Sequence, residues 1–69
     1  MKISARNRLK GKVVDVTLGA TTAHVRIDIG GSVITASITN EAVTELGLSA
    51  GKEAYAVVKA SDVMVAVDD

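Results

Sequence analysis

The chain contains no cysteine, proline, tryptophan or phenylalanine, and Tyr55 is its only aromatic residue. Without cysteine there can be no disulfide and no thiolate metal site. A single histidine, His24, makes a histidine-based metal site within one chain unfavourable. One aromatic residue also gives little surface on which nucleic-acid bases could stack. We therefore expect no metal ion coordinated directly by protein atoms and no nucleic-acid partner.

An excess of charge of either sign is also missing. Eight basic residues balance eight acidic ones, so bulk attraction to nucleic acid or to an anionic membrane is not supported. No apolar run approaches the length of a membrane span, and the amino terminus has no apolar core of signal-peptide length. These absences predict a cytoplasmic protein with no membrane partner.

What the chain has in quantity is aliphatic side chains. Apolar residues make up 48% of only 69 residues, enough for one domain spanning 1–69. A domain of this size buries only about 60% of its unfolded surface, so its stability is marginal without support. Because disulfides are excluded, oligomerisation is the expected support.

The apolar residues follow strand patterns over most of the chain. A period of two or a run of β-branched residues predicts five strands, at about 12–18, 22–29, 32–38, 53–59 and 63–67. Gly30-Gly31 separates the second and third by two residues, which indicates a tight hairpin. The last two strands are apolar on both faces. We therefore expect another subunit to cover one face of each.

A short helix is predicted between the third and fourth strands. Thr39 or Asn40 can cap its start, and Gly47 is placed for the left-handed position that ends it. The resulting fold class is all-β with one short helix. The order of elements predicts a five-stranded barrel of the oligonucleotide/oligosaccharide-binding (OB) type that oligomerises through apolar strand faces. A small antiparallel sandwich is the alternative.

Catalysis finds little support in the sequence. No two acids form an obvious general acid and base pair, and no nucleophile, histidine and acid follow one another as a triad. His24 lies on the polar face of a predicted strand and is interpreted as a surface or interface histidine. We predict a binding protein rather than an enzyme.

Hydrogen-bond donors gather instead at the ends of predicted elements. Ser4-Ala5-Arg6-Asn7 lies in a segment that holds five of the eight basic residues before the first acid, Asp15. Lys59-Ala60-Ser61 and Thr39-Asn40 form two further groups. Taken alone, each also fits a simpler role as a solvated tail, a turn or a helix cap. Together they offer the donors and positive charge that a compact oxyanion needs.

The ordered set of motifs resembles the molybdate-binding Mop domain, found alone in the molbindins. The resemblance covers nearly the whole chain, and its main segments are Ser4–Val14, Ile34–Glu41, Glu45–Leu48 and Val58–Met64. It implies cytoplasmic binding and storage or buffering of molybdate, or tungstate, by a homo-oligomer, expected to be a hexamer. It also implies that the sites lie at subunit interfaces.

The resemblance implies site residues as well. The oxyanion-binding residues would be Ser4, Ala5 (through its N–H), Arg6, Thr39, Lys59, Ala60 and Ser61. A second candidate site maps loosely to the turn of Gly19, Ala20, Thr21 and Thr22. We expect separate chains to supply Arg6 and Lys59 to one anion.

Elementary chemistry agrees with an oxyanion that carries no proton. Molybdate has four acceptor oxygens, so a site made only of donors suits it, whereas protonated phosphate would leave a donor unmet. Two other functions stay open from the sequence. One is a purely structural oligomerisation module, and the other is a nucleic-acid-binding OB barrel.

Overall fold

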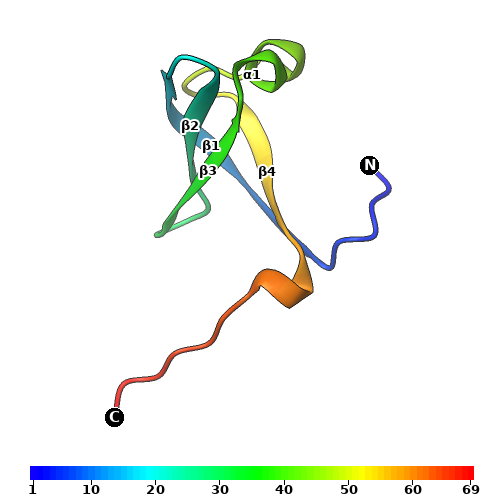
Figure 1. Ribbon diagram of the computed structural model, residues 1–69. Coiled ribbons are helices and arrows are strands. Elements are labelled where there is room, and N and C mark those ends of the chain that lie inside the picture. Colours follow the sequence, from blue (N-terminus) through cyan, green and yellow to red (C-terminus); the bar gives the residue numbers. More distant parts are fainter.

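The computed structural model describes all 69 residues. Its elements are β1 (Asn7–Leu18), β2 (Thr22–Asp28), β3 (Val33–Thr39), α1 (Asn40–Leu46), β4 (Glu53–Val58) and the 3₁₀ turn η1 (Ala60–Asp62). Four antiparallel strands form one sheet in the order β3-β2-β1-β4. The sheet curls into a half-barrel, with α1 at one end, and both terminal segments leave the sheet from the other end (Figure 1). The one α-helix has seven residues, and no helix is long and apolar enough to cross a membrane.

The strand β1 starts earlier than its sequence pattern suggested, at Asn7 rather than Lys12. Its first half, Asn7–Lys12, pairs with β4, and its second half pairs with β2. Gly11 lies where β1 is paired with β4 and packs closely against β2, because a β-carbon there would overlap the carbonyl oxygen of Asp28. This half of the strand was not predicted from the sequence, because the side chains of residues 7–12 are mostly polar or basic and show no apolar alternation.

A β-bulge at Val14 controls which side chains of β1 face the core. The register with β2 shifts between Val13 and Asp15, so one extra residue is inserted. Val13 is buried and Val16 packs against the core, although they are three positions apart and would otherwise face opposite sides. Asp15 instead lies opposite Arg26, and the two side chains form an ion pair.

The predicted hairpin and helix are both confirmed. Gly30 and Gly31 have φ values of 96° and 102°, and the Ile29 N–H donates to the Ser32 carbonyl at 2.9 Å. The Thr39 hydroxyl accepts from the Ala42 N–H and caps α1. Gly47 takes the left-handed conformation, and the N–H groups of Gly47 and Leu48 close the helix end.

The hydrophobic core of one chain is small. Only six residues are buried: Val13, Ala23, Val25, Ile27, Val43 and Ala56. The radius of gyration is 12.9 Å, against about 11 Å expected for a compact domain of this length. The difference reflects the two terminal segments, which extend away from the sheet (Figure 1).

The predicted fifth strand is not formed. Residues 63–69 have no regular secondary structure and leave the sheet after η1 (Figure 1). A strand needs a hydrogen-bonded neighbour, and this segment has none within its own chain. The result is an open four-stranded half-barrel in place of the five-stranded barrel expected from the sequence.

Candidate oxyanion-binding site

The pairing of β1 with β4 brings two distant segments of the chain together. Asn7, the first residue of β1, lies opposite Val58, the last residue of β4. The Asn7 side-chain amide also donates to the Val58 carbonyl at 3.1 Å. Because the strands are antiparallel, the residues before Asn7 and those after Val58 leave the sheet side by side.

These two segments line an open pocket, which we call the amino-terminal pocket. It has a volume of about 690 Å³. Its lining residues are Ile3, Ser4, Ala5, Arg6, Val57, Lys59, Ala60, Ser61 and Asp62. Six of the seven residues implied as oxyanion ligands therefore meet in one chain. Arg6 and Lys59, which the resemblance led us to expect from separate chains, line the same pocket within one chain.

The two cations of the pocket have no carboxylate partner. The chain forms two salt bridges, Lys10–Glu53 and Arg26–Asp15, and neither involves Arg6 or Lys59. The Arg6 guanidinium donates only to main-chain carbonyls, to Ser4 at 2.9 Å and to Ile3 at 3.5 Å. Because all five N–H donors of a guanidinium can bond, Arg6 keeps donors free for an anion.

Backbone donors add to these side chains. The N–H groups of Ala5, Ala60 and Ser61 donate no hydrogen bond within the chain, and neither serine hydroxyl is engaged. Such free donors in an open pocket are solvated by water, which an oxyanion can displace. The pocket thus offers two positive charges and several uncommitted donors.

Asp62 also lines the pocket, so the site is not made of donors alone. Counting Arg6 and Lys59 against Asp62, the pocket of one chain carries a net charge of +1. A dianion needs +2 for neutrality, so one chain does not neutralise it. The carboxylate also supplies an acceptor, which weakens the expected rejection of protonated phosphate.

Thr39, the seventh implied ligand, lies elsewhere. It pairs with Thr22 at the end of β2 that follows the β1–β2 turn. The twelve residues of β1 separate this end from the amino-terminal pocket by about 35 Å along the strand. One anion cannot touch both regions of the same chain.

Thr39 instead joins the residues of the second candidate site, Gly19–Thr22. The Asn40 side-chain amide donates to the Gly19 carbonyl at 3.0 Å, and the Asn40 N–H donates to the Thr21 carbonyl at 2.9 Å. The Asn40 side-chain oxygen is buried without a hydrogen-bond partner. We call this group, residues 19–22 with Thr39 and Asn40, the cap cluster. The Thr39 hydroxyl already accepts from Ala42, but its own proton remains free to donate.

Comparison with known proteins now bears on this pocket. The family model described as TOBE domain matches residues 3–65, most of the chain and all of the pocket. The chain belongs to the TOBE-domain family. This TOBE domain is 56% identical over 69 residues to the probable molybdenum-pterin-binding protein of Haemophilus influenzae, covering 99% of the chain and 100% of the relative.

Solved structures give the same result for this TOBE domain. The molybdate-binding protein from Sporomusa ovata superposes with a TM-score of 0.92 at 36% identity, covering 97% of this chain and 100% of that one. The cytoplasmic molybdate-binding protein ModG, solved with molybdate bound, superposes with a TM-score of 0.87 at 46% identity. It covers 93% of this chain, which spans 46% of ModG. The resemblance to the Mop domain is confirmed, and these relatives are binding proteins rather than enzymes.

Three further residues shape this TOBE domain's candidate sites, although they were not selected as site residues. Asn7 ties β1 to β4, Asn40 anchors the turn of the cap cluster, and Asp62 adds an acid to the amino-terminal pocket. Asn7 and Asn40 stood next to implied ligands in the sequence, but their hydrogen-bond partners lie 51 and 21 residues away. No local pattern could have identified those partners.

Proposed function

We propose that this protein binds molybdate, or tungstate, in the amino-terminal pocket and serves as a cytoplasmic store or buffer for the anion. One observation carries the proposal: Arg6 and Lys59, both without an acidic partner, share a pocket with free N–H donors. The names of the relatives support the anion, since the Sporomusa ovata protein and ModG are both described as molybdate-binding.

The chemistry of the pocket suits a tetrahedral dianion. Ser4, Ser61 and the N–H groups of Ala5 and Ala60 provide neutral donors, and Arg6 and Lys59 provide charge-assisted ones. Nothing in the proposed role requires a reaction. The protein holds the anion and releases it, with no nucleic-acid or membrane partner. The cytoplasmic setting follows ModG, which is described as cytoplasmic.

A site shared between subunits of a homo-oligomer, which we propose to be a hexamer, resolves the charge deficit. The pocket of one chain carries a net +1, whereas two such pockets facing one another supply +2 and neutralise the dianion. Facing pockets also exclude water from the anion, which strengthens each charge-assisted bond. Thr39, about 35 Å away in its own chain, can contribute to such a site only from another subunit.

Titration calorimetry with a panel of anions tests the function. Molybdate and tungstate should both bind with measurable heat at a fixed ratio to the chain. Sulfate, of the same shape and charge but smaller, should bind more weakly, and so should phosphate. Absence of heat from all four anions would contradict the proposal and favour a purely structural oligomerisation module.

A further inference from the structure

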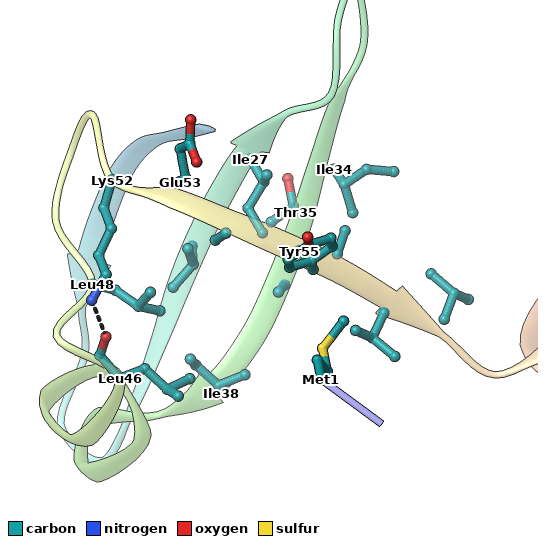
Figure 2. Close-up of a pocket in the computed structure, with 16 residues that line it drawn as sticks. Met1, Ile27, Ile34, Thr35, Ile38, Leu46, Leu48, Lys52, Glu53 and Tyr55 are labelled. Atoms are coloured by element: carbon teal, nitrogen blue, oxygen red, sulfur yellow. Dashed lines mark hydrogen bonds between the residues drawn. The ribbon is translucent and has the colours of Figure 1, made fainter. Parts of the chain in front are cut away.

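Two pockets of similar size have linings of opposite character. One, of about 630 Å³, lies between the edge strands β3 and β4, and thirteen of its sixteen lining residues are hydrophobic (Figure 2). Its only basic residue, Lys52, already donates to the Leu46 carbonyl at 2.6 Å (Figure 2). In the amino-terminal pocket, of about 690 Å³, three of the nine lining residues are charged. A small anion therefore finds uncommitted cations only in the second of these two pockets.

Asp62 is the one acid that lines the amino-terminal pocket, and the proposed molybdate site makes no use of it. Its side chain is exposed, and its carboxylate accepts no hydrogen bond. It forms no salt bridge either, although Arg6 and Lys59 line the same pocket. A carboxylate that neither supports the fold nor neutralises a cation keeps its acceptor oxygens available to a ligand.

The turn η1 holds Asp62 close to the donors of the pocket. The Asp62 N–H donates to the Lys59 carbonyl at 2.9 Å, which closes a four-residue turn. A turn of this kind brings the Cα atoms of its two end residues within about 7 Å of each other. The N–H groups of Ala60 and Ser61 lie between these ends and donate to no group of the chain. The turn therefore offers a cation, two N–H donors and one acceptor carboxylate to the same pocket.

This set of groups fits a tetrahedral oxyanion that carries one proton. Hydrogen phosphate has three oxygens that only accept and one O–H that must donate, whereas molybdate has four accepting oxygens. The hydroxyls of Ser4 and Ser61 can also accept, but a hydrogen bond to a carboxylate is about twice as strong as one to a neutral oxygen. A fully deprotonated anion gains no bond from Asp62 and meets only its negative charge.

We infer that Asp62 is a specificity-determining residue of the amino-terminal pocket, through which the pocket also takes singly protonated tetrahedral oxyanions such as hydrogen phosphate. The carboxylate accepts the O–H of such an anion, and it lowers the affinity for molybdate by like-charge repulsion. The inference rests on the proposed function, because both anions use the same donors of the pocket. It adds a second class of ligand and names the residue that distinguishes the two classes.

The two effects of the carboxylate differ in size. Across about 7 Å of water, a carboxylate repels a dianion enough to weaken its binding roughly three- to tenfold. A hydrogen bond to a charged acceptor strengthens binding by about tenfold or more. For molybdate only the repulsion acts, whereas for hydrogen phosphate the hydrogen bond offsets it. Asp62 therefore narrows the preference of the pocket for molybdate over phosphate without reversing it.

Two substitutions separate the acceptor of Asp62 from its charge. Asp62→Ala removes both, whereas Asp62→Asn removes the charge and keeps an amide oxygen that accepts. Titration calorimetry with molybdate and with phosphate is run at mildly alkaline pH, at which both anions carry two negative charges. Both variants should bind molybdate roughly three- to tenfold more tightly than the natural protein. Asp62→Ala should raise the ratio of the phosphate Kd to the molybdate Kd about tenfold or more, and Asp62→Asn should raise it less.

Asp68→Ala is the matched control, because it removes the same side chain from an exposed position outside the pocket and should change neither Kd. If the natural protein binds molybdate but Asp62→Ala leaves the ratio of the two Kd values unchanged, the role of Asp62 is overturned and the proposed function stands. An equal change of that ratio in Asp68→Ala overturns the role of Asp62 in the same way. Absence of molybdate binding by the natural protein overturns both.

Discussion

Arg6 and Lys59 differ in what they contact from three of the other six basic side chains of the molecule. Lys10 and Arg26 pair with acids, and Lys52 donates to the end of α1. The Arg6 guanidinium donates only to two carbonyls of the preceding residues, so it keeps other N–H donors free, and the Lys59 ammonium makes no hydrogen bond. Unpaired cations at one pocket are the residue-scale reason for assigning an anion to it.

Gly11 is a second residue whose identity matters, because β1 and β2 leave no room for a side chain there. In Gly11→Ala the new methyl group overlaps the carbonyl oxygen of Asp28, and the strands must separate. We expect a loss of about 1–3 kcal/mol in the free energy of unfolding, measured by urea denaturation. Ser37→Ala, at an exposed position of β3, should change stability little. Equal stability of Gly11→Ala and the natural chain would show that the strands can separate freely.

At the scale of elements, the bulge of β1 explains one ion pair. It places Asp15 opposite Arg26, whose guanidinium Nε donates to both Asp15 carboxylate oxygens at 3.1 Å. This hydrogen bond and the charge of Arg26 hold the pKa of Asp15 below its ordinary value of 3.8, against a smaller opposing effect of burial. Both side chains remain about half exposed.

The lowered pKa of Asp15 fixes the sign of a pH dependence. The folded protein binds the Asp15 proton less tightly than the unfolded chain does, so the pair stabilises the fold above pH 3.8 and loses its effect as the pH falls through the folded pKa. Asp15→Asn should therefore melt slightly lower than the natural protein at neutral pH. The two melting temperatures should converge in acid. Glu45→Gln, an exposed and unpaired acid on α1, is the control, and a constant difference for Asp15→Asn at all pH values would contradict the assignment.

The elements also show how much of the fold can be predicted from the sequence. The alternation of apolar and polar residues predicted β2 and β3, and Gly30-Gly31 predicted the hairpin between them. Thr39 and Gly47 predicted the two ends of α1. All of these signals are local in the sequence. The first half of β1 was missed because its pairing with β4 is long-range and its side chains are polar. The segment 63–67 has the composition of a strand, but composition does not determine which strand it pairs with or in which copy.

The same limit applies to the candidate site. The residues before Asn7 and after Val58 were selected as donors, but only the β1–β4 register shows that one chain brings them together. Thr39 was grouped with them by resemblance, whereas the register of β3 with β2 places it in the cap cluster. Which side chains share a site depends on strand pairing, which the sequence does not encode locally.

On the scale of the whole molecule, the turn η1 connects the pocket to assembly. Lys59, Ala60 and Ser61 line the amino-terminal pocket, and the exposed carboxyl-terminal segment, residues 63–69, follows within two residues. An anion held by this turn and by Arg6 would fix the direction in which the segment leaves. Binding and association are then coupled, since a ligand that binds only the assembled form stabilises it.

The coupling predicts a shift in thermal stability. Molybdate at about one hundred times its Kd should stabilise the folded assembly by about 3 kcal/mol, which corresponds to an increase of about 10 °C or more in the melting temperature. Calorimetric scans with and without the anion measure the shift, and sodium chloride of equal ionic strength is the control. An unchanged melting temperature at saturating molybdate would contradict the coupling.

The most direct test of the central claim is titration calorimetry of molybdate against Arg6→Ala and Arg8→Ala. The two variants remove the same charge two positions apart, but only Arg6 lines the amino-terminal pocket. We predict that Arg6→Ala raises the Kd for molybdate about ten- to hundredfold, because the variant loses one charge-assisted hydrogen-bond donor. Arg8→Ala should bind as the natural protein does. Unchanged molybdate affinity in Arg6→Ala, or an equal loss in both variants, would contradict the assignment of this pocket as the oxyanion site.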